Sequence, residues 1–180
     1  LCSIALSAEP SRTSAFTAMT AIRHAGGFVS FDPNIREDLW QDEHLLRLCL
    51  RQALQLADVV KLSEEEWRLI SGKTQNDRDI CALAKEYEIA MLLVTKGAEG
   101  VVVCYRGQVH HFAGMSVNCV DSTGAGDAFV AGLLTGLSST GLSTDEREMR
   151  RIIDLAQRCG ALAVTAKGAM TALPCRQELE

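Results

Sequence analysis

Apolar positions along the chain form two kinds of pattern, short continuous runs and longer stretches with helical spacing. The clearest helical stretch is Glu43–Ala57, in which apolar residues recur at every third or fourth position. The clearest continuous run is Ala90–Thr95, which is typical of a strand covered on both faces of a parallel sheet. Because the two kinds of pattern alternate through the chain, they predict an α/β protein.

The same patterns assign the remaining elements. Strands are expected at Leu1–Leu6, Phe28–Phe31, Asp58–Leu62, Val101–Tyr105 and Gln108–Phe112, the last two forming a hairpin around Arg106-Gly107. Helices are expected at Pro10–His24, Ser63–Ile70, Asp77–Tyr87, Asp145–Thr165 and from the Asp121–Asp127 motif to about Leu137, with loops at Thr140–Thr144 and Ala166–Pro174. This order predicts a doubly wound, mostly parallel sheet flanked by helices, with one antiparallel hairpin.

Composition and charge narrow the class of protein. The 180 residues are 47% hydrophobic, which is enough for one domain with a core. The net charge is −5, whereas proteins that bind nucleic acids usually carry a basic surface. No apolar run in the sequence is as long as a membrane-spanning helix. Seven cysteines without a CxxC pair fit reduced core residues better than a disulfide framework or a zinc ribbon. We therefore expect a cytoplasmic protein without nucleic-acid or membrane partners.

Four polar segments follow expected strands. They are Asp32-Pro33-Asn34, Ser63–Glu66, Thr95–Gly100 and Asp121–Asp127. In open α/β sheets, ligands bind beyond the carboxyl ends of the strands, so these segments are expected to line one binding site.

The segment Asp121–Asp127 has the residue types of an anion site. Gly124, Ala125 and Gly126 leave the backbone N–H groups accessible, and the helix that follows adds its positive end. Asp127, in the first helical turn, is placed to accept a proton from a hydroxyl group. The alternative is that Asp127 only favours the helix dipole, which is worth about 0.3–1 kcal/mol.

The other segments leave similar alternatives open. Gly97 and Gly100 permit a ligand to approach the backbone, but they also fit a simple connection between strands. Arg36 can clamp phosphate oxygens, or it is an exposed residue of a surface turn. Glu66 can hold Mg²⁺ through water, or it belongs to a solvated helix start in which it forms a capping box with Ser63.

Five segments taken together resemble one protein family. DSTGAGDAFVAGLL resembles the second signature of the ribokinase-like sugar kinases, also called the phosphofructokinase-B family. FDPNIREDLW resembles the DxNxRxxLW stretch of its fructokinase branch, KLSEEE the NxxE segment, VTKGAEG the nucleotide loop, and AKGAMTALP the closing loop beside the adenine. All five occur in the family order, and the resemblance covers essentially the whole chain.

The resemblance implies roles for individual residues. Asp127 matches the catalytic base, while Gly124, Ala125 and Gly126 match the anion hole. Near the nucleotide it implies phosphate contacts from Asn34 and Arg36 and a loop formed by Thr95, Lys96, Gly97 and Gly100. It implies that Glu66 organises Mg²⁺ through water and that Asp121, Thr123, Ala163, Ala166 and Gly168 bind K⁺ in potassium-dependent members.

The implied activity is ATP-dependent phosphorylation of a small-molecule sugar or riboside. Among family members the chain resembles the bacterial aminoimidazole riboside kinases most, which implies the 5′-hydroxyl of aminoimidazole riboside as acceptor, with fructose or another sugar or nucleoside as the alternative. A dinucleotide oxidoreductase is not favoured, because no GxGxxG follows the first strand. The full-length protein is expected to be a homodimer.

The chain departs from the family pattern in two respects. Ser63 replaces the asparagine of NxxE, and its shorter hydroxyl leaves more of the Mg²⁺ shell to water. The glycine-rich first signature and the small β lid do not occur. Together with the strand-like opening LCSIAL, this predicts that residues 1–180 are the C-terminal nucleotide-binding part of a single ribokinase-like domain, which acts as a non-catalytic nucleotide-binding module when isolated.

Overall fold

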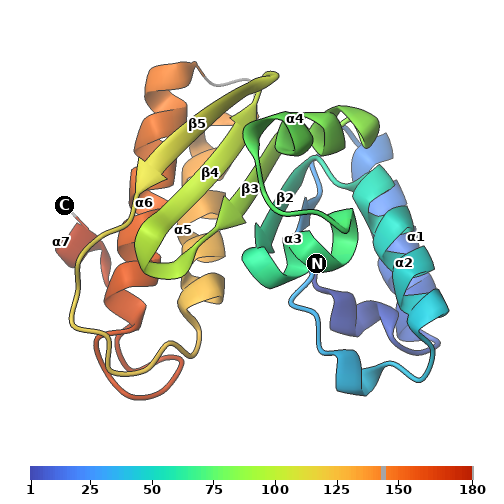
Figure 1. The fold of residues 1–180 in the computed structure, drawn as a ribbon, viewed down its shortest axis with the longest axis horizontal. Coiled ribbons are helices and arrows are strands. Elements are labelled where there is room, and N and C mark those ends of the chain that lie inside the picture. Colours follow the sequence, from blue (N-terminus) through green and yellow to red (C-terminus); the bar gives the residue numbers. More distant parts are fainter. Residues whose placement is uncertain (143–144, 180) are drawn as a thin grey trace. The chain divides into compact units, whose positions relative to one another are not determined.

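The computed structural model describes residues 1–142 and 145–179, so the predicted loop Thr140–Thr144 lies partly outside the described residues. The chain forms two compact units (Figure 1). Unit 1 comprises Leu1–Lys96 and Val101–Phe112, and unit 2 comprises Gly97–Gly100 and Ala113–Glu180. None of the described helices is both long enough and apolar enough to span a membrane.

A five-stranded sheet organises unit 1. Its order is β1 (Ser30–Phe31), β2 (Val59–Ser63), β3 (Met91–Thr95), β4 (Gly100–Tyr105) and β5 (Gln108–Ala113). β1, β2 and β3 are parallel, with Val59 opposite Met91, whereas β4 runs antiparallel to β3. The predicted α/β class, with a mostly parallel sheet and one hairpin, is confirmed.

Helices cover one face of this sheet. They are α1 (Ser11–His24), α2 (Glu43–Leu56), α3 (Glu64–Ser71) and α4 (Asp77–Glu86), with the short 3-10 segments η1 (Ser3–Leu6) and η2 (Glu37–Leu39). Alternate strand residues such as Val60, Leu62, Leu92 and Val94 pack with residues of all four helices in one core. Trp67 of α3 is fully buried in that core.

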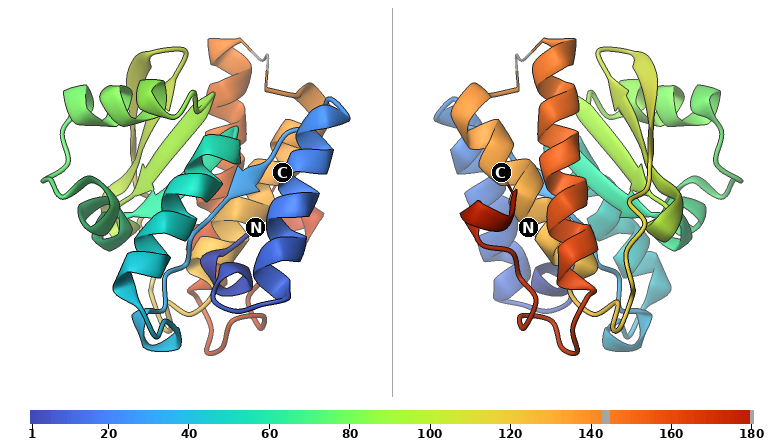
Figure 2. Two further views of the ribbon diagram at one scale, coloured as in Figure 1. Left: turned by 90° about the vertical axis from the view of Figure 1, so that its right-hand side faces the viewer. Right: turned by 90° about the vertical axis from the view of Figure 1, so that its left-hand side faces the viewer.

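Unit 2 is built on two long helices. α5 (Ala125–Thr140) and α6 (Glu146–Ala163) pack along each other, as both side views show (Figure 2). Ala128, Cys159 and Ala163 are buried in the core of this unit. The unit also contains η3 (Gly97–Glu99) and a short terminal helix, α7 (Arg176–Leu179), which the apolar pattern did not predict.

The prediction of a strand at Leu1–Leu6 is wrong for most of that segment. Only Leu1 and Ser3 bond to the segment of β1, since the amino group of Leu1 donates to the carbonyl of Ser30 at 2.8 Å, its carbonyl accepts from Asp32 N at 3.0 Å, and Ser3 N donates to the carbonyl of Pro33 at 2.7 Å. The chain then forms η1, and the guanidinium of Arg12 donates to the carbonyls of Leu6 and Ser7 at its end. A short apolar run can be buried as a helical turn as well as a strand, and spacing alone does not separate the two.

Candidate active site

A groove of about 340 Å³ lies at the carboxyl ends of β1 and β2 in unit 1. Its lining includes Asn34 and Arg36, which follow β1, and Glu66, which lies in the first turn of α3 after β2. Two of the four segments that the sequence assigned to the edge of the sheet, those after β1 and β2, therefore meet in unit 1, as expected for a parallel sheet.

Glu66 holds two segments of this groove together. Its Oε2 accepts from the backbone N–H of Ser63 at 2.8 Å, and Ser63 Oγ accepts from Glu66 N at 3.2 Å, so the predicted capping box is present. Its Oε1 accepts from Ile35 N at 2.9 Å, which fixes the turn after β1. Each carboxylate oxygen keeps a further lone pair, so Glu66 can still accept from a metal-bound water.

The turn after β1 presents polar groups in an unusual backbone conformation. Asn34 has φ of 44°, a left-handed value that asparagine tolerates better than most residues. The guanidinium of Arg36 is exposed and donates to the neighbouring carbonyl of Ile35 at 3.3 Å. Most of its N–H donors therefore remain available to an anion.

The N-terminus of α5 in unit 2 is left open. Side chains cap α2, α3, α4 and α6, through Asp42, Ser63, Asn76 and Asp145, whereas no side chain caps α5. Within the described residues, the N–H groups of Gly126 and Asp127 donate to no protein acceptor. Uncapped N–H groups at the positive end of a helix make a binding site for an anion such as phosphate.

Gly124 is required at this position for two reasons. Its φ is +82°, a left-handed conformation that other residues adopt at a cost of roughly 1–2 kcal/mol. A Cβ built on it would lie 2.8 Å from the carbonyl oxygen of Ala169. The turn therefore keeps its backbone uncovered and packs directly against the closing loop.

Asp127 lies in the first turn of α5, as predicted, with its side chain exposed. No hydrogen bond or ion pair is formed by its carboxylate with the rest of the described chain. The carboxylate is therefore free to accept a hydrogen bond from a hydroxyl group.

Asp121 joins the start of this turn to the closing loop. Its Oδ1 accepts from the hydroxyl and the N–H of Thr123 at 2.7 and 2.9 Å, and its Oδ2 accepts from Gly168 N at 2.8 Å. These bonds, that of the Thr123 hydroxyl above all, hold the pKa of Asp121 below its usual value. Of the expected potassium ligands, unit 2 thus brings Asp121, Thr123 and Gly168 together. Ala163 is buried at the end of α6, and Ala166 follows two residues beyond its cap.

The predicted nucleotide loop is a tight turn between β3 and β4. Thr95 donates its hydroxyl to the carbonyl of Leu62 at 3.2 Å, and η3 occupies the next residues after Lys96. Gly114 N donates to Glu99 O at 3.2 Å, and a Cβ on Gly114 would collide with the carbonyl oxygen of Ala98. The turn is therefore held by a backbone contact that only glycine permits at position 114.

Residues 2–176 match the family described as pfkB family carbohydrate kinase. The chain belongs to the pfkB family of carbohydrate kinases. It is 56% identical over 180 residues to a fructokinase of Klebsiella pneumoniae, covering 100% of this chain and 59% of that protein. The chain therefore spans little more than half the length of this relative.

Two solved structures of the pfkB family resemble this one. A fructokinase double mutant from Vibrio cholerae, in a form bound to fructose, ADP and potassium, has a TM-score of 0.92 at 43% identity and covers 99% of this chain and 57% of its own. Aminoimidazole riboside kinase from Salmonella enterica, complexed with aminoimidazole riboside and an ATP analogue, has a TM-score of 0.90 at 35% identity, with coverages of 99% and 60%. The predicted ribokinase-like fold is confirmed.

One groove residue of this pfkB-family chain was not identified from the sequence. Lys61 of β2 is only 8% exposed, and its Nζ lies 3.2 and 3.4 Å from the two carboxylate oxygens of Asp32. It lines the groove with Asn34 and Arg36. The available signal was a lysine inside the apolar run VVKLS, because a buried lysine requires a partner of opposite charge.

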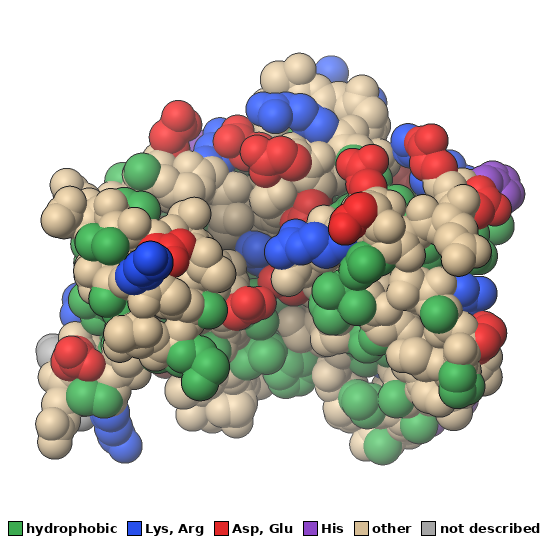
Figure 3. All heavy atoms as spheres, turned by 90° about the horizontal axis from the view of Figure 1, so that it is seen from below, with side chains coloured by type: hydrophobic (Ala, Val, Ile, Leu, Met, Phe, Trp, Pro, Cys, Tyr) green, Lys and Arg blue, Asp and Glu red, His purple; other side chains and the backbone are tan. Residues whose placement is uncertain are grey.

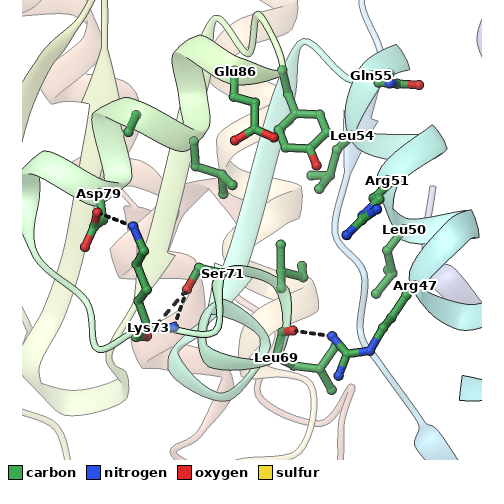
Figure 4. Close-up of a pocket in the computed structure, with 14 residues that line it drawn as sticks. Arg47, Leu50, Arg51, Leu54, Gln55, Leu69, Ser71, Lys73, Asp79 and Glu86 are labelled. Atoms are coloured by element: carbon green, nitrogen blue, oxygen red, sulfur yellow. Dashed lines mark hydrogen bonds and ion pairs between the residues drawn. The ribbon is translucent and has the colours of Figure 1, made fainter. Parts of the chain in front are cut away.

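A second groove of unit 1, of about 590 Å³, contains none of the residues predicted from the pfkB signatures. Figure 4 shows Arg47 and Arg51 of α2 on one side and Lys73, paired with Asp79, on the other. Arg47 is likewise paired with Glu43, at 2.8 Å. Two of these three cations, Arg47 and Lys73, are therefore paired with carboxylates.

Positively and negatively charged side chains lie close together on the surface (Figure 3). On the face drawn in Figure 3, Lys and Arg are interspersed with Asp and Glu. The described part of the chain has no group of three or more His, Cys, Asp or Glu placed to hold a metal ion.

Proposed function

We propose that the protein containing this chain transfers the γ-phosphoryl group of ATP to a hydroxyl group of a small sugar. The observation that supports the proposal is the N-terminus of α5, which follows Gly124 and has no side-chain cap. The exposed carboxylate of Asp127, which has no partner in the described chain, lies in its first turn. Membership of the pfkB carbohydrate kinases supports the same reaction.

In this proposal different residues of the chain have different roles in the in-line transfer of the phosphoryl group. Asp127 accepts the proton of the attacking hydroxyl, so that the oxygen becomes a better nucleophile. The N–H groups of Gly126 and Asp127, with Ala125 and Gly124 forming the rest of the turn, stabilise the charge on the transferred phosphoryl oxygens. Arg36 and Asn34 contribute donors for phosphate oxygens, and Arg36 has most of its donors free for this.

Nucleotide and cations are assigned to residues whose chemistry fits them. Thr95, Lys96, Gly97 and Gly100 form the nucleotide loop, where an ammonium group and open backbone suit phosphate and ribose oxygens. Glu66 would hold a water of Mg²⁺, and the cation would supply positive charge against that of the phosphates. For K⁺ we propose Asp121 and the backbone carbonyls of Thr123, Ala163, Ala166 and Gly168, in keeping with the potassium named for the Vibrio cholerae structure.

Fructose is the acceptor that the comparisons favour. Identity is 56% to the Klebsiella fructokinase and 35% to aminoimidazole riboside kinase, which reverses the preference drawn from the sequence motifs. The test measures phosphate transfer from ATP by the complete protein to fructose, ribose and aminoimidazole riboside. We expect the highest kcat/KM with fructose. A highest value with aminoimidazole riboside would refute fructose as the acceptor, and no transfer to any acceptor would refute the kinase assignment.

The 180-residue chain by itself is proposed to bind nucleotide without catalysing transfer. It contains the residues assigned to the nucleotide, whereas its relative is substantially longer. Calorimetric titration of the chain with a non-hydrolysable ATP analogue, beside a transfer assay, separates the two properties. Light scattering of the complete protein tests the proposed homodimer in the same preparation.

A further inference from the structure

Two cysteines of unit 1 lie in direct contact. Cys81 is on α4 and Cys104 is on β4, 23 positions later, and their sulfur atoms are 3.3 Å apart. The Cys81 thiol also lies 3.6 Å from the carbonyl oxygen of Gly107 in the turn that follows β4. A disulfide bond is about 2.05 Å long, so the two sulfurs need to approach by little more than 1 Å.

The two thiols differ in access. Cys81 is half-buried at the surface of α4, whereas Cys104 is 2% exposed within the core. Burial above all, and then the neighbouring Cys81 thiol, raises the pKa of Cys104 to about 12. Cys81 is therefore the thiol that a dissolved oxidant reaches, and Cys104 is the buried thiol that can react with the oxidised Cys81.

We propose that Cys81 and Cys104 form a reversible oxidation site, which hydrogen peroxide converts to an intramolecular disulfide. Cys81 sulfur attacks one peroxide oxygen, so that the O–O bond breaks and a sulfenic acid and one water are formed. Cys104 sulfur then attacks the Cys81 sulfur, the S–OH bond breaks, and the Cys104 proton leaves with the hydroxide as a second water. Two thiols and one peroxide give one disulfide and two waters.

The position of the pair explains how a weakly acidic thiol can react. Cys104 needs no diffusion to meet Cys81, and a pre-formed contact replaces a bimolecular encounter with an intramolecular step. The cross-link ties α4 to the end of β4, while Gly100 of the nucleotide loop begins the same strand at its other end. The modification therefore constrains unit 1 without occupying the residues of the proposed nucleotide loop.

The test oxidises the purified chain with hydrogen peroxide, alkylates the remaining thiols and maps the peptides without reduction. We expect one cross-linked peptide pair containing Cys81 and Cys104, which disappears after dithiothreitol. Trp40 and Trp67 both belong to unit 1, so tryptophan fluorescence should report a Tm raised by roughly 5–10 °C in the oxidised chain. Affinity for an ATP analogue should remain unchanged.

Variants separate this site from general thiol oxidation. Cys81→Ser should abolish the cross-link, whereas Cys119→Ser and Cys175→Ser, which remove exposed cysteines, should leave it intact. The proposal is overturned if oxidised wild-type chain keeps Cys81 and Cys104 alkylatable, if Cys81 proceeds to sulfinic acid, or if Cys81 is found linked to another cysteine. These outcomes concern thiols alone, so they are independent of whether the chain binds nucleotide.

Discussion

Replacing Glu66 by glutamine tests how the groove of unit 1 is held together. The amide oxygen of glutamine can accept from one of the two backbone N–H groups, of Ser63 or Ile35, but its NH₂ group faces the other. The variant therefore loses one hydrogen bond to a charged acceptor and leaves a poorly exposed N–H without a partner. We expect the free energy of unfolding to fall by about 1.5–3 kcal/mol.

Glu64→Gln is the matched control for this substitution. Glu64 lies in the same first turn of α3, so both variants lose the same favourable interaction with the helix dipole, about 0.3–1 kcal/mol. Urea denaturation followed by tryptophan fluorescence reports on unit 1, because both tryptophans lie in that unit. The difference between the unfolding free energies of the two variants measures the contribution of the hydrogen bonds from Ser63 N and Ile35 N to Glu66. Equal stabilities of Glu66→Gln and Glu64→Gln would refute the reasoning.

Three further substitutions or titrations test other contacts. Gly114→Ala should displace the turn at Ala98 and weaken binding of an ATP analogue by roughly tenfold or more, with unit 1 stability unchanged; unaltered affinity in calorimetry would contradict this. The backbone amide NMR resonance of Gly168 should shift as Asp121 titrates, with a midpoint below pH 3.8. The hydrogen bond from Gly168 N to Asp121 is present while the carboxylate is ionised and is lost as pH falls through its lowered pKa. A midpoint at pH 3.8 or higher would count against this hydrogen bond. Lys61→Met should destabilise unit 1 by roughly 1.5–3 kcal/mol in urea denaturation, since the carboxylate of Asp32 loses its ion pair with the Lys61 ammonium group, and an unchanged midpoint would show that the pair is dispensable.

Much of the fold follows from local patterns in the sequence. The helical spacing of Glu43–Ala57 and the continuous run before Thr95 identified α2 and β3 because each pattern is long relative to its period. The capping box at Ser63 was predictable because both of its residues lie within one helical turn. The segments after β1 and β2 share one groove because parallel strands carry their ends to one edge of a sheet.

The features that sequence reasoning missed depend on contacts between distant positions. Lys61 is held by Asp32, which lies 29 positions away, directly after β1, so the apolar run around it gave no indication of the partner. The contact between Cys81 and Cys104 likewise arises only when α4 packs on the sheet. The strand predicted at Leu1–Leu6 failed for a different reason, because a short apolar run fits a buried helical turn as well as a strand.

In the proposed function, Asp127 is the base of a phosphoryl transfer at the N-terminus of α5. The most direct test is the turnover of Asp127→Asn in the complete protein with ATP and fructose, measured beside the affinity for an ATP analogue. The account predicts that kcat falls by roughly 10²–10⁴-fold while nucleotide affinity is retained. Normal turnover by Asp127→Asn would contradict it.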